Sequence, residues 1–186
     1  MRKAVLLFLS VMMVSVLSGC GGQKDSQAEQ GGGQSQYTEA LEVLNQEDEL
    51  FSMYGGDQEN AVMDGPGKFD ITKTEELESV YGLAADQSSN IEDAATMVHL
   101  MNANTFTGAV YRLKEGVDMD DFADALKSCI LARQWICGQP DTLVLINVDG
   151  RYIITAFGEA GIIENFKTNA LSALSGAQVI TEAPVA

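Results

Sequence analysis

The chain contains two pairs of strand-like apolar runs, and a helical pattern follows each pair. In the first pair, residues 94–101 and 105–113 are joined through Asn102-Ala103-Asn104, which is typical of a hairpin loop. A helix is expected over about 119–136, with Asp118 as its N-cap. Its apolar positions recur at helical spacing and are Met119, Phe122, Leu126, Cys129 and Ile130.

The second pair covers 142–148 and 151–157, and Asp149-Gly150 between them predicts a two-residue hairpin turn. A second helix is expected over about 159–174. A two-residue turn distributes the apolar residues over both faces of this hairpin. One face is expected to carry Val144, Ile146, Val148, Ile153 and Phe157, and the other Leu143, Leu145, Tyr152 and Ile154.

Two apolar faces leave two interpretations open. Either the strands are central and other parts of the chain cover both faces, with residues 37–82 available for this, or one face is a surface for a partner. The order of elements predicts an α+β fold, ββαββα. Its four-stranded, mainly antiparallel sheet is expected to carry both helices on one face.

Short helices are expected before this unit. Residues 37–54 have weak amphipathic periodicity, which indicates a short helix, and 55–67 are rich in turn residues, which indicates a loop. Thr74 is a capping residue followed by acidic residues, so a helix is expected from there to Tyr81, ending at Gly82.

The N-terminus has the pattern of a secretory signal peptide. Arg2 and Lys3 precede an apolar run over 4–17 that is too short to span a bilayer. Leu17-Ser18-Gly19-Cys20 then resembles the bacterial lipobox, which implies cleavage before Cys20 and attachment of diacylglycerol to its thiol. Because two acyl chains anchor a protein stably, we expect an extracytoplasmic protein held to the cell membrane by this lipid.

Residues 21–36 contain no large apolar side chain and are mainly Gly, Gln and Ser. Such a composition predicts a flexible tether with a span of roughly 20–25 Å. The chain is therefore expected to comprise a signal peptide (1–19), a lipidated cysteine and tether (20–36), a helix and loop (37–70), an α+β domain (71–176) and a C-terminal tail (177–186).

Charge narrows the class of partner. The 186 residues include 27 acidic and 11 basic residues, and the formal net charge is −16. Residues 1–19 contain two basic and no acidic residues, so the rest of the chain carries −18. This charge disfavours nucleic acid, whose binding requires clustered Lys and Arg, and it disfavours direct contact with anionic lipid. The expected partners are the membrane through the lipid anchor, and an envelope protein or a small ligand.

Two cysteines remain besides Cys20. On a continuous helix Cys129 and Cys137 would lie about 12 Å apart, which is too far for a disulfide. A disulfide therefore requires the helix to end soon after Arg133. The alternative is that both cysteines are small buried side chains.

Candidate reactive residues are few. Asp118, Asp120, Asp121 and Asp124 are the candidates for a divalent cation site, and they also fit a helix N-terminus whose dipole the acids complement. His99 is the only histidine, and its pairing with Cys129 is the candidate arrangement for a hydrolase or thiol enzyme. Otherwise His99 is a surface or rim residue. No catalytic residue is assigned, and no cofactor is expected.

Over about 71–174 the chain resembles a Clostridia-type family of Gram-positive lipoproteins that carry a C-terminal domain of unknown function. The resemblance rests on the lipobox, the tether, the element order, and the segments Val80-Tyr81-Gly82-Leu83 and Val110-Tyr111-Arg112-Leu113-Lys114. This chain departs from the family at Met97-Val98-His99-Leu100-Met101, which replaces a plainer strand. The resemblance implies anchoring on a Gram-positive membrane and assigns no activity.

The function expected from these features is a non-enzymatic binding or assembly module. The alternatives are a small hydrolase or thiol enzyme that uses His99 and Cys129, and an acidic metal-binding lipoprotein.

Overall fold

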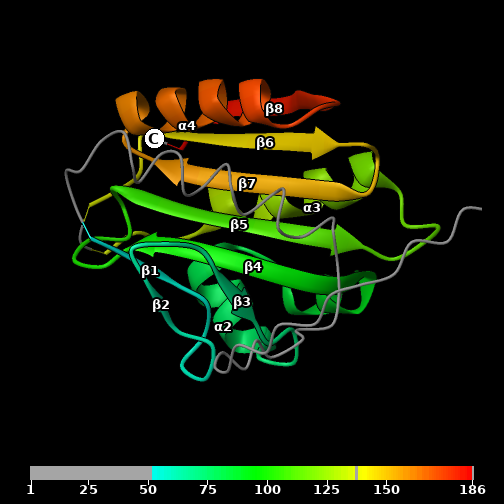
Figure 1. Ribbon diagram of the computed structural model, residues 1–186, viewed down its shortest axis with the longest axis horizontal. Coiled ribbons are helices and arrows are strands. Elements are labelled where there is room, and N and C mark those ends of the chain that lie inside the picture. The colour runs from blue at the N-terminus through cyan, green and yellow to red at the C-terminus, as the bar shows by residue number, and fades with distance from the viewer. Residues whose placement is uncertain (1–51, 137, 186) are drawn as a thin grey trace, which may run out of the picture. The chain divides into compact units, whose positions relative to one another are not determined.

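The computed structural model describes residues 52–136 and 138–185 (Figure 1). The predicted signal peptide, Cys20 and the tether lie outside these residues. The helices are α2 (Thr74–Tyr81), α3 (Met119–Ala132) and α4 (Ala160–Ala173), with a 3₁₀ helix over Ala85–Asn90. The strands are β1 (Met53–Gly55), β2 (Val62–Met63), β3 (Gly67–Phe69), β4 (Ile91–His99), β5 (Phe106–Leu113), β6 (Thr142–Val148), β7 (Tyr152–Gly158) and β8 (Ala177–Pro184).

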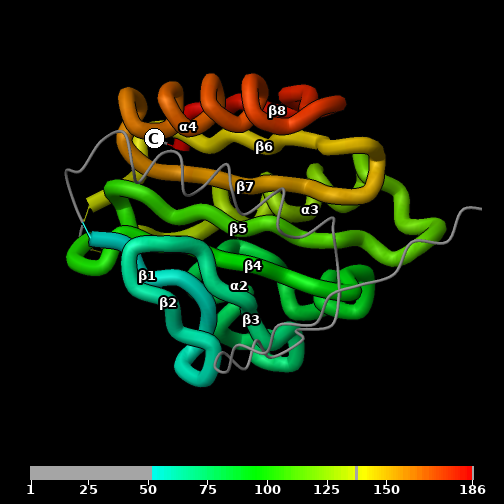
Figure 2. The backbone as a smooth tube through the Cα atoms, in the orientation of Figure 1, coloured from blue at the N-terminus to red at the C-terminus, as the bar shows by residue number. Residues whose placement is uncertain are grey.

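These strands form one antiparallel sheet in the order β2-β1-β4-β5-β7-β6-β8. The short strand β3 pairs with β4 next to β1. Figure 2 shows the four long central strands β4, β5, β7 and β6 lying side by side. No helix in the described residues is long and apolar enough to cross a bilayer.

Helices pack on both faces of the sheet, with α2 and α3 on one face and α4 on the other (Figure 1). The α2/α3 face has a core that includes Leu77, Tyr81, Tyr111, Phe122, Leu126, Ile153 and Phe157. The α4 face has a core that includes Val144, Ile146, Ile154, Ile163, Phe166 and Ala170. The expectation that other parts of the chain cover both apolar faces of the β6–β7 hairpin is therefore confirmed.

The α+β class is confirmed, but the predicted four strands and the ββαββα order are wrong. β1, β2 and β3 extend one side of the sheet, and β8 extends the other. Residues 53–54, predicted to be helical, are in β1, and residues 177–184, predicted to be a tail, form β8 along β6. Short strands such as β1 and β2 carry too few residues to show a period, so only their pairing partners define them.

The prediction that both long helices share one face is also wrong, and strand direction explains why. The α3 connection runs from β5 past β7 to β6, and the α4 connection runs from β7 past β6 to β8. Both connections move the same way across the sheet, but β5 and β7 run in opposite directions. If both connections have the usual right-handed sense, their helices must lie on opposite faces.

The register predicted for the β6–β7 hairpin is shifted by one residue. Val148 pairs with Tyr152, so three residues rather than two lie in the loop. Asp149 and Gly150 both have positive φ, and the N–H of Arg151 donates to the carbonyl of Val148. The turn is thus the predicted Asp-Gly turn, but Arg151 is left out of the pairing. This extra residue moves Ile153 and Phe157 to the face of Leu143 and Leu145.

The helix ends agree with sequence expectations in most respects. α2 ends at Tyr81, and Gly82 adopts φ 75° as its C-cap. Its N-cap is Lys73 rather than Thr74, and the Lys73 side chain makes no cap hydrogen bond. α3 begins after Asp118 as predicted and ends at Ala132, four residues before the predicted end.

Candidate functional site

The candidate acidic cluster lies at the start of α3. Oδ1 of Asp118 accepts the N–H groups of Asp120 and Asp121, each at 3.0 Å, which confirms Asp118 as the N-cap. In residues 52–136 and 138–185, no group of three or more His, Cys, Asp or Glu side chains is arranged to hold a metal ion. Asp118 is thus the N-cap of α3, and Asp120 and Asp121 lie in its first turn.

His99 and Cys129 are not brought together. His99 is at the end of β4, two residues from Met97 and paired with Met53, and both methionines belong to the core under α4. Side chains two residues apart on a strand share a face, so His99 lies on the α4 side. Cys129 belongs to α3 on the opposite side of the sheet. Nδ1 of His99 is 3.0 Å from the carbonyl oxygen of Asn102, within its own hairpin.

Cys129 lines an open groove of about 520 Å³ between α2 and α3. The groove is lined by Glu75, Glu78, Ser79, Cys129, Ala132 and Arg133. Burial raises the pKa of the Cys129 thiol, and the nearby carboxylate of Glu78 raises it further. A raised pKa lowers the thiolate fraction, so this thiol is poorly suited to be a nucleophile. Cys129 carries a free thiol, and its predicted alternative partner Cys137 lies outside the described residues.

The chain after α3 closes one end of this groove. The Arg133 guanidinium lies 4.3 Å from the centre of the Trp135 ring and donates to the carbonyl of Val80 at 3.1 Å. The Trp135 ring in turn packs edge-on against Phe157, with centroids 5.7 Å apart. Arg133 and Trp135 thus fasten α2 to the sheet, and both side chains are engaged in packing.

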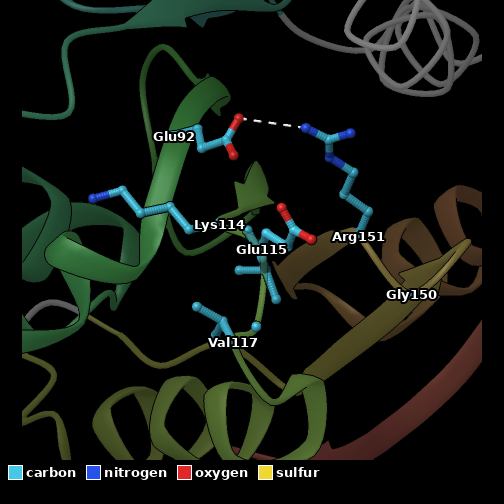
Figure 3. A pocket seen from close by; sticks show the side chains of 8 residues that line it. Glu92, Lys114, Glu115, Val117, Gly150 and Arg151 are labelled. Carbon is cyan, nitrogen blue, oxygen red and sulfur yellow. Dashed lines mark hydrogen bonds and ion pairs between the residues drawn. The ribbon is translucent and has the colours of Figure 1, made fainter.

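A second cleft, of about 310 Å³, lies where β4 begins and β5 ends (Figure 3). The carboxylate of Glu92 contacts two guanidiniums, Arg112 at 3.1 Å and Arg151 at 3.5 Å. Lys114 points away from this group, because its ammonium donates to the carbonyl of Ser89 at 2.6 Å. The exposed Glu115 also lines the cleft. Among the lining residues, the carboxylates of Glu92 and Glu115 balance the cations of Lys114 and Arg151, so the cleft has little excess positive charge for an anionic ligand.

A third, polar cavity of about 410 Å³ lies at the opposite end of the sheet, at the start of α4. It is lined by Asn102, Asn104, Thr105, Gly138, Gln139, Asp141, Glu159, Ala160 and Gly161. Oδ2 of Asp141 accepts the N–H of Ala160 at 3.0 Å, and the amide of Gln139 donates to the carbonyl of Val185. These polar groups hold the ends of α4 and β8 together.

Asp57 is a buried carboxylate that sequence reasoning missed. It accepts hydrogen bonds from the backbone of Glu59, Asn60 and Asp70 and from the Asn60 amide, and Lys73 lies 3.5 Å away. Burial alone would raise the pKa of Asp57, but the hydrogen bonds from Asp70 and Asn60 outweigh it and lower the pKa to about 2. These hydrogen bonds join the loop after β1 to Asp70 after β3, and Lys73 lies at the start of α2. Asp57 therefore acts as a structural clamp between the β1–β3 loops and α2.

Four exposed apolar side chains lie on the two sides of β1 near one edge of the sheet. We define the methionine corner as Val62, Met63, Leu100 and Met101, four of the eight exposed large hydrophobic residues in the described chain. Met101 is 84% exposed and Met63 is 57% exposed. β1 lies between the two pairs, because Tyr54 pairs with Met63 and the Leu100 N–H donates to the Ser52 carbonyl.

Comparisons with known proteins returned no match for this chain among protein-family models, curated proteins or solved structures.

The methionine corner, like Asp57, was missed by sequence reasoning. Val62 and Met63 fell in a predicted loop, and Leu100 and Met101 were placed in a predicted strand. The sequence did contain a signal for exposed apolar residues: Val62-Met63 and Leu100-Met101 each stand directly before turn residues, where buried side chains are not expected.

Proposed function

We propose that the protein is a lipid-anchored, extracytoplasmic binding module that docks an envelope protein through the methionine corner. The observation that supports this is the exposure of Val62, Met63, Leu100 and Met101, which are 40–84% exposed and lie on the two sides of β1. Contiguous exposed apolar groups are typical of interaction sites on soluble domains. Methionine suits such a site, because its flexible, polarisable side chain adapts to the shape of a partner.

The proposed extracytoplasmic, lipid-anchored location is argued from residues 1–20. The short apolar run and Leu17-Ser18-Gly19-Cys20 support export and lipidation, and the resemblance to Gram-positive lipoproteins is consistent with that address. The formal charge of −18 after cleavage favours a domain that stays off an anionic bilayer. An apolar corner on an otherwise acidic domain then offers a partner protein its main contact.

A non-enzymatic role is favoured over a thiol or hydrolytic enzyme by the positions of the candidate groups. His99 and Cys129 belong to opposite faces of the sheet, and the pKa of the thiol is raised. A general base must lie within hydrogen-bond reach of the group it activates. A binding role needs only the exposed surface that the methionine corner provides.

The test is site-specific photo-crosslinking in cells that produce the lipidated protein. A photoreactive residue is introduced at Met101, and the control carries it at Glu115, an exposed site past the far end of β5. We expect one discrete adduct from position 101, its loss when Leu100→Asp is added, and none from position 115. Equal adducts from both positions, or none from position 101, would overturn the docking role.

The anchor is tested separately by detergent phase partitioning of the same cells. The unaltered chain is expected in the detergent phase, and Cys20→Ala is expected in the aqueous phase or uncleaved, because the substitution removes the lipid-accepting thiol. A Cys20→Ala chain that is cleaved at the same place and still partitions into detergent contradicts the anchor without bearing on the methionine corner.

A further inference from the structure

The outer side of β8 is an edge of the sheet to which no described strand is paired. β8 pairs with β6 on its inner side and is the last strand in the order of the sheet (Figure 1). A free strand edge presents backbone N–H and C=O groups that can pair with another chain. With eight residues, β8 offers more of these groups than β2, which has two.

The hydrogen-bond pattern identifies which backbone groups of β8 point outward. The N–H of Val185 donates to the carbonyl of Asp141, and bonded and non-bonded residues alternate along an antiparallel pair. Glu182, three residues before Val185, therefore directs its N–H and C=O away from β6. Beyond the register shift, Val179 pairs with Ile146, whose own backbone bonds go to β7, so Val179 also points outward. No described backbone group bonds to the outward N–H groups of Val179 and Glu182.

The side chains along this edge are apolar or already paired. Val179 is 37% exposed, and Leu171 of α4 is 40% exposed. Leu171 follows Lys167 by one helical turn, and the Lys167 ammonium lies 3.0 Å from the carboxylate of Glu182. Leu171 therefore lies on the side of α4 that faces β8. Lys167 also pairs with Glu164 at 2.6 Å, so one cation serves both carboxylates.

The surface formed by α4 and β8 carries little of the negative charge of the chain. Residues 160–185 contain two acidic residues and one basic residue, whereas the chain from Cys20 onward has a formal charge of −18. Because like charges repel, two copies of an acidic chain meet more readily at a surface whose charges are few and paired.

We propose that two copies of the chain pair through β8, antiparallel and related by a two-fold axis, so that their sheets become continuous. The axis passes between Ile180 and Thr181, and Val179 of each copy then faces Glu182 of the other. Each facing pair exchanges two backbone hydrogen bonds, because both residues point outward. The second copy also covers the exposed part of Val179, and its α4 lies beside Leu171.

The register shift favours a second copy over an unrelated extended chain. It places Val179 and Glu182 three residues apart, whereas the outward groups of a regular strand recur every two residues. A second copy carries the same interval, so both facing pairs form at once. The pairing uses the β8 edge of both copies, and it therefore closes at two.

The pairing joins the sheets at β8 and leaves a β2 edge at each end. Two methionine corners are then displayed at opposite ends of one continuous sheet, because each corner lies beside β1. This inference does not rest on the proposed docking role or on the lipid anchor, since it uses only α4, β6 and β8.

Disulfide formation at the two-fold axis tests the pairing in cells that produce the full chain. The background carries Cys129→Ala and Cys137→Ala, and Thr181→Cys is added to it. The two copies of residue 181 lie one residue out of register across the axis, so their Cα atoms are about 6 Å apart. This distance suits a disulfide, and mild oxidation is expected to give a covalent dimer. The background chain alone measures any dimer formed through Cys20.

Gln178→Cys in the same background is the matched control. Thr181 pairs with Leu145 and Gln178 pairs with Asn147, so both side chains lie on the α2/α3 face of β8. The two copies of residue 178 would lie five residues out of register, or about 17 Å apart, which is too far for a disulfide. We expect Thr181→Cys to give on the order of tenfold more covalent dimer than Gln178→Cys.

The deciding variant adds Val179→Pro to Thr181→Cys. Proline removes an outward N–H and spares the hydrogen bonds between β8 and β6. The covalent dimer is expected to fall to the level of Gln178→Cys, and circular dichroism of the purified chain must show that the variant is folded. If the Pro variant does not fold, Val179→Asp takes its place, because it puts a like charge opposite Glu182 of the second copy.

Several results would overturn the proposed pairing. Thr181→Cys that gives no dimer above the background, or no more than Gln178→Cys, leaves only random collision between copies. A dimer that persists in a folded Val179 variant shows a contact that does not use the β8 edge. An adduct whose mass is not twice that of the chain assigns the edge to a different protein.

Discussion

The helices α3 and α4 each follow a pair of adjacent strands, β4–β5 and β6–β7, but the two helices are held in different ways. α3 follows its own N-cap, since Asp118 accepts two N–H groups of the first turn. The N-cap of α4 is Glu159, whose side chain makes no such bond, and the N–H of Ala160 instead donates to Asp141, which precedes β6. One helix start is thus encoded locally, and the other depends on tertiary structure.

The two faces of the sheet are also covered by different numbers of helices. The α3 face is closed by α2 and α3, and the Asp57 clamp and the Arg133–Trp135 contact hold α2 and the chain after α3 in place. The α4 face is closed by one described helix, which packs on β6, β7 and β8 and reaches Phe106 at the start of β5. Similar element order therefore does not imply similar packing, because each face is completed by different parts of the chain.

The largest test of this comparison removes the aromatic anchor of each helix. Phe122 of α3 packs against Tyr111, and Phe166 of α4 packs against Phe106, with ring centroids 6.3 and 5.5 Å apart. Phe122→Ala and Phe166→Ala are each expected to lower the free energy of unfolding by about 3–5 kcal/mol in urea denaturation. Amide hydrogen exchange should become faster in α2 and α3 for Phe122→Ala, and in α4 and β8 for Phe166→Ala. Identical exchange maps would mean that the two faces open as one cooperative unit.

A smaller effect is expected from acid, and it should arise on the α3 side. The pKa of Asp57 falls from 3.8 to about 2 on folding. A lowered carboxyl pKa stabilises the fold above the unfolded pKa, and this stabilisation is lost as the pH falls from about 4 to 2. The loss should be about 2 kcal/mol. Urea denaturation at stepped pH, followed by Trp135 fluorescence, measures it.

Asp57→Asn is expected to flatten this part of the pH profile and to lower stability at neutral pH. Glu115→Gln, at an exposed carboxylate, is the control and should keep the acid-dependent loss. A profile that is the same for Asp57→Asn and for the unaltered chain would remove Asp57 as the source of the acid dependence.

The smallest effects compare the two helix starts directly. Asp118→Ala removes a local cap and is expected to cost about 1 kcal/mol. Glu159→Ala removes no cap bond and should change stability by less than about 0.5 kcal/mol. Asp141→Ala removes the distant acceptor of α4 and should cost about 1 kcal/mol. Chemical denaturation resolves this order, and a larger cost at Glu159 than at Asp141 would refute it.

Features with local signals were predicted from the sequence. Asp118 precedes an apolar stripe, Gly82 follows one, and Asp149-Gly150 separates two β-rich runs, so each was recognised within a few residues. The register of the hairpin was missed because it depends on Arg151, a single residue that the turn leaves unpaired. Local patterns indicate that a turn exists more reliably than they indicate its exact pairing.

Features that depend on distant pairing were not predictable. β8 pairs only with β6, and its residues alternate poorly because it lies at the edge of the sheet. The choice of face for α3 and α4 follows from strand order, which no single segment reveals. In the candidate site, Asp57 and the methionine corner combine residues that are far apart in sequence, and β1 and β3 bring them together.

The short length of β2 affects how readily two copies of the domain can pair through the edges of their sheets. The free edge of a long strand can pair with the next molecule, and repetition of that pairing builds fibrils. β2 offers only two residues at one edge of the sheet. At the other edge, the β6–β8 pairing has a register shift between Leu145 and Ile146, and β8 ends at Pro184. The β2 edge therefore offers a second copy little backbone to pair with, so any backbone pairing between copies is expected at the β8 edge.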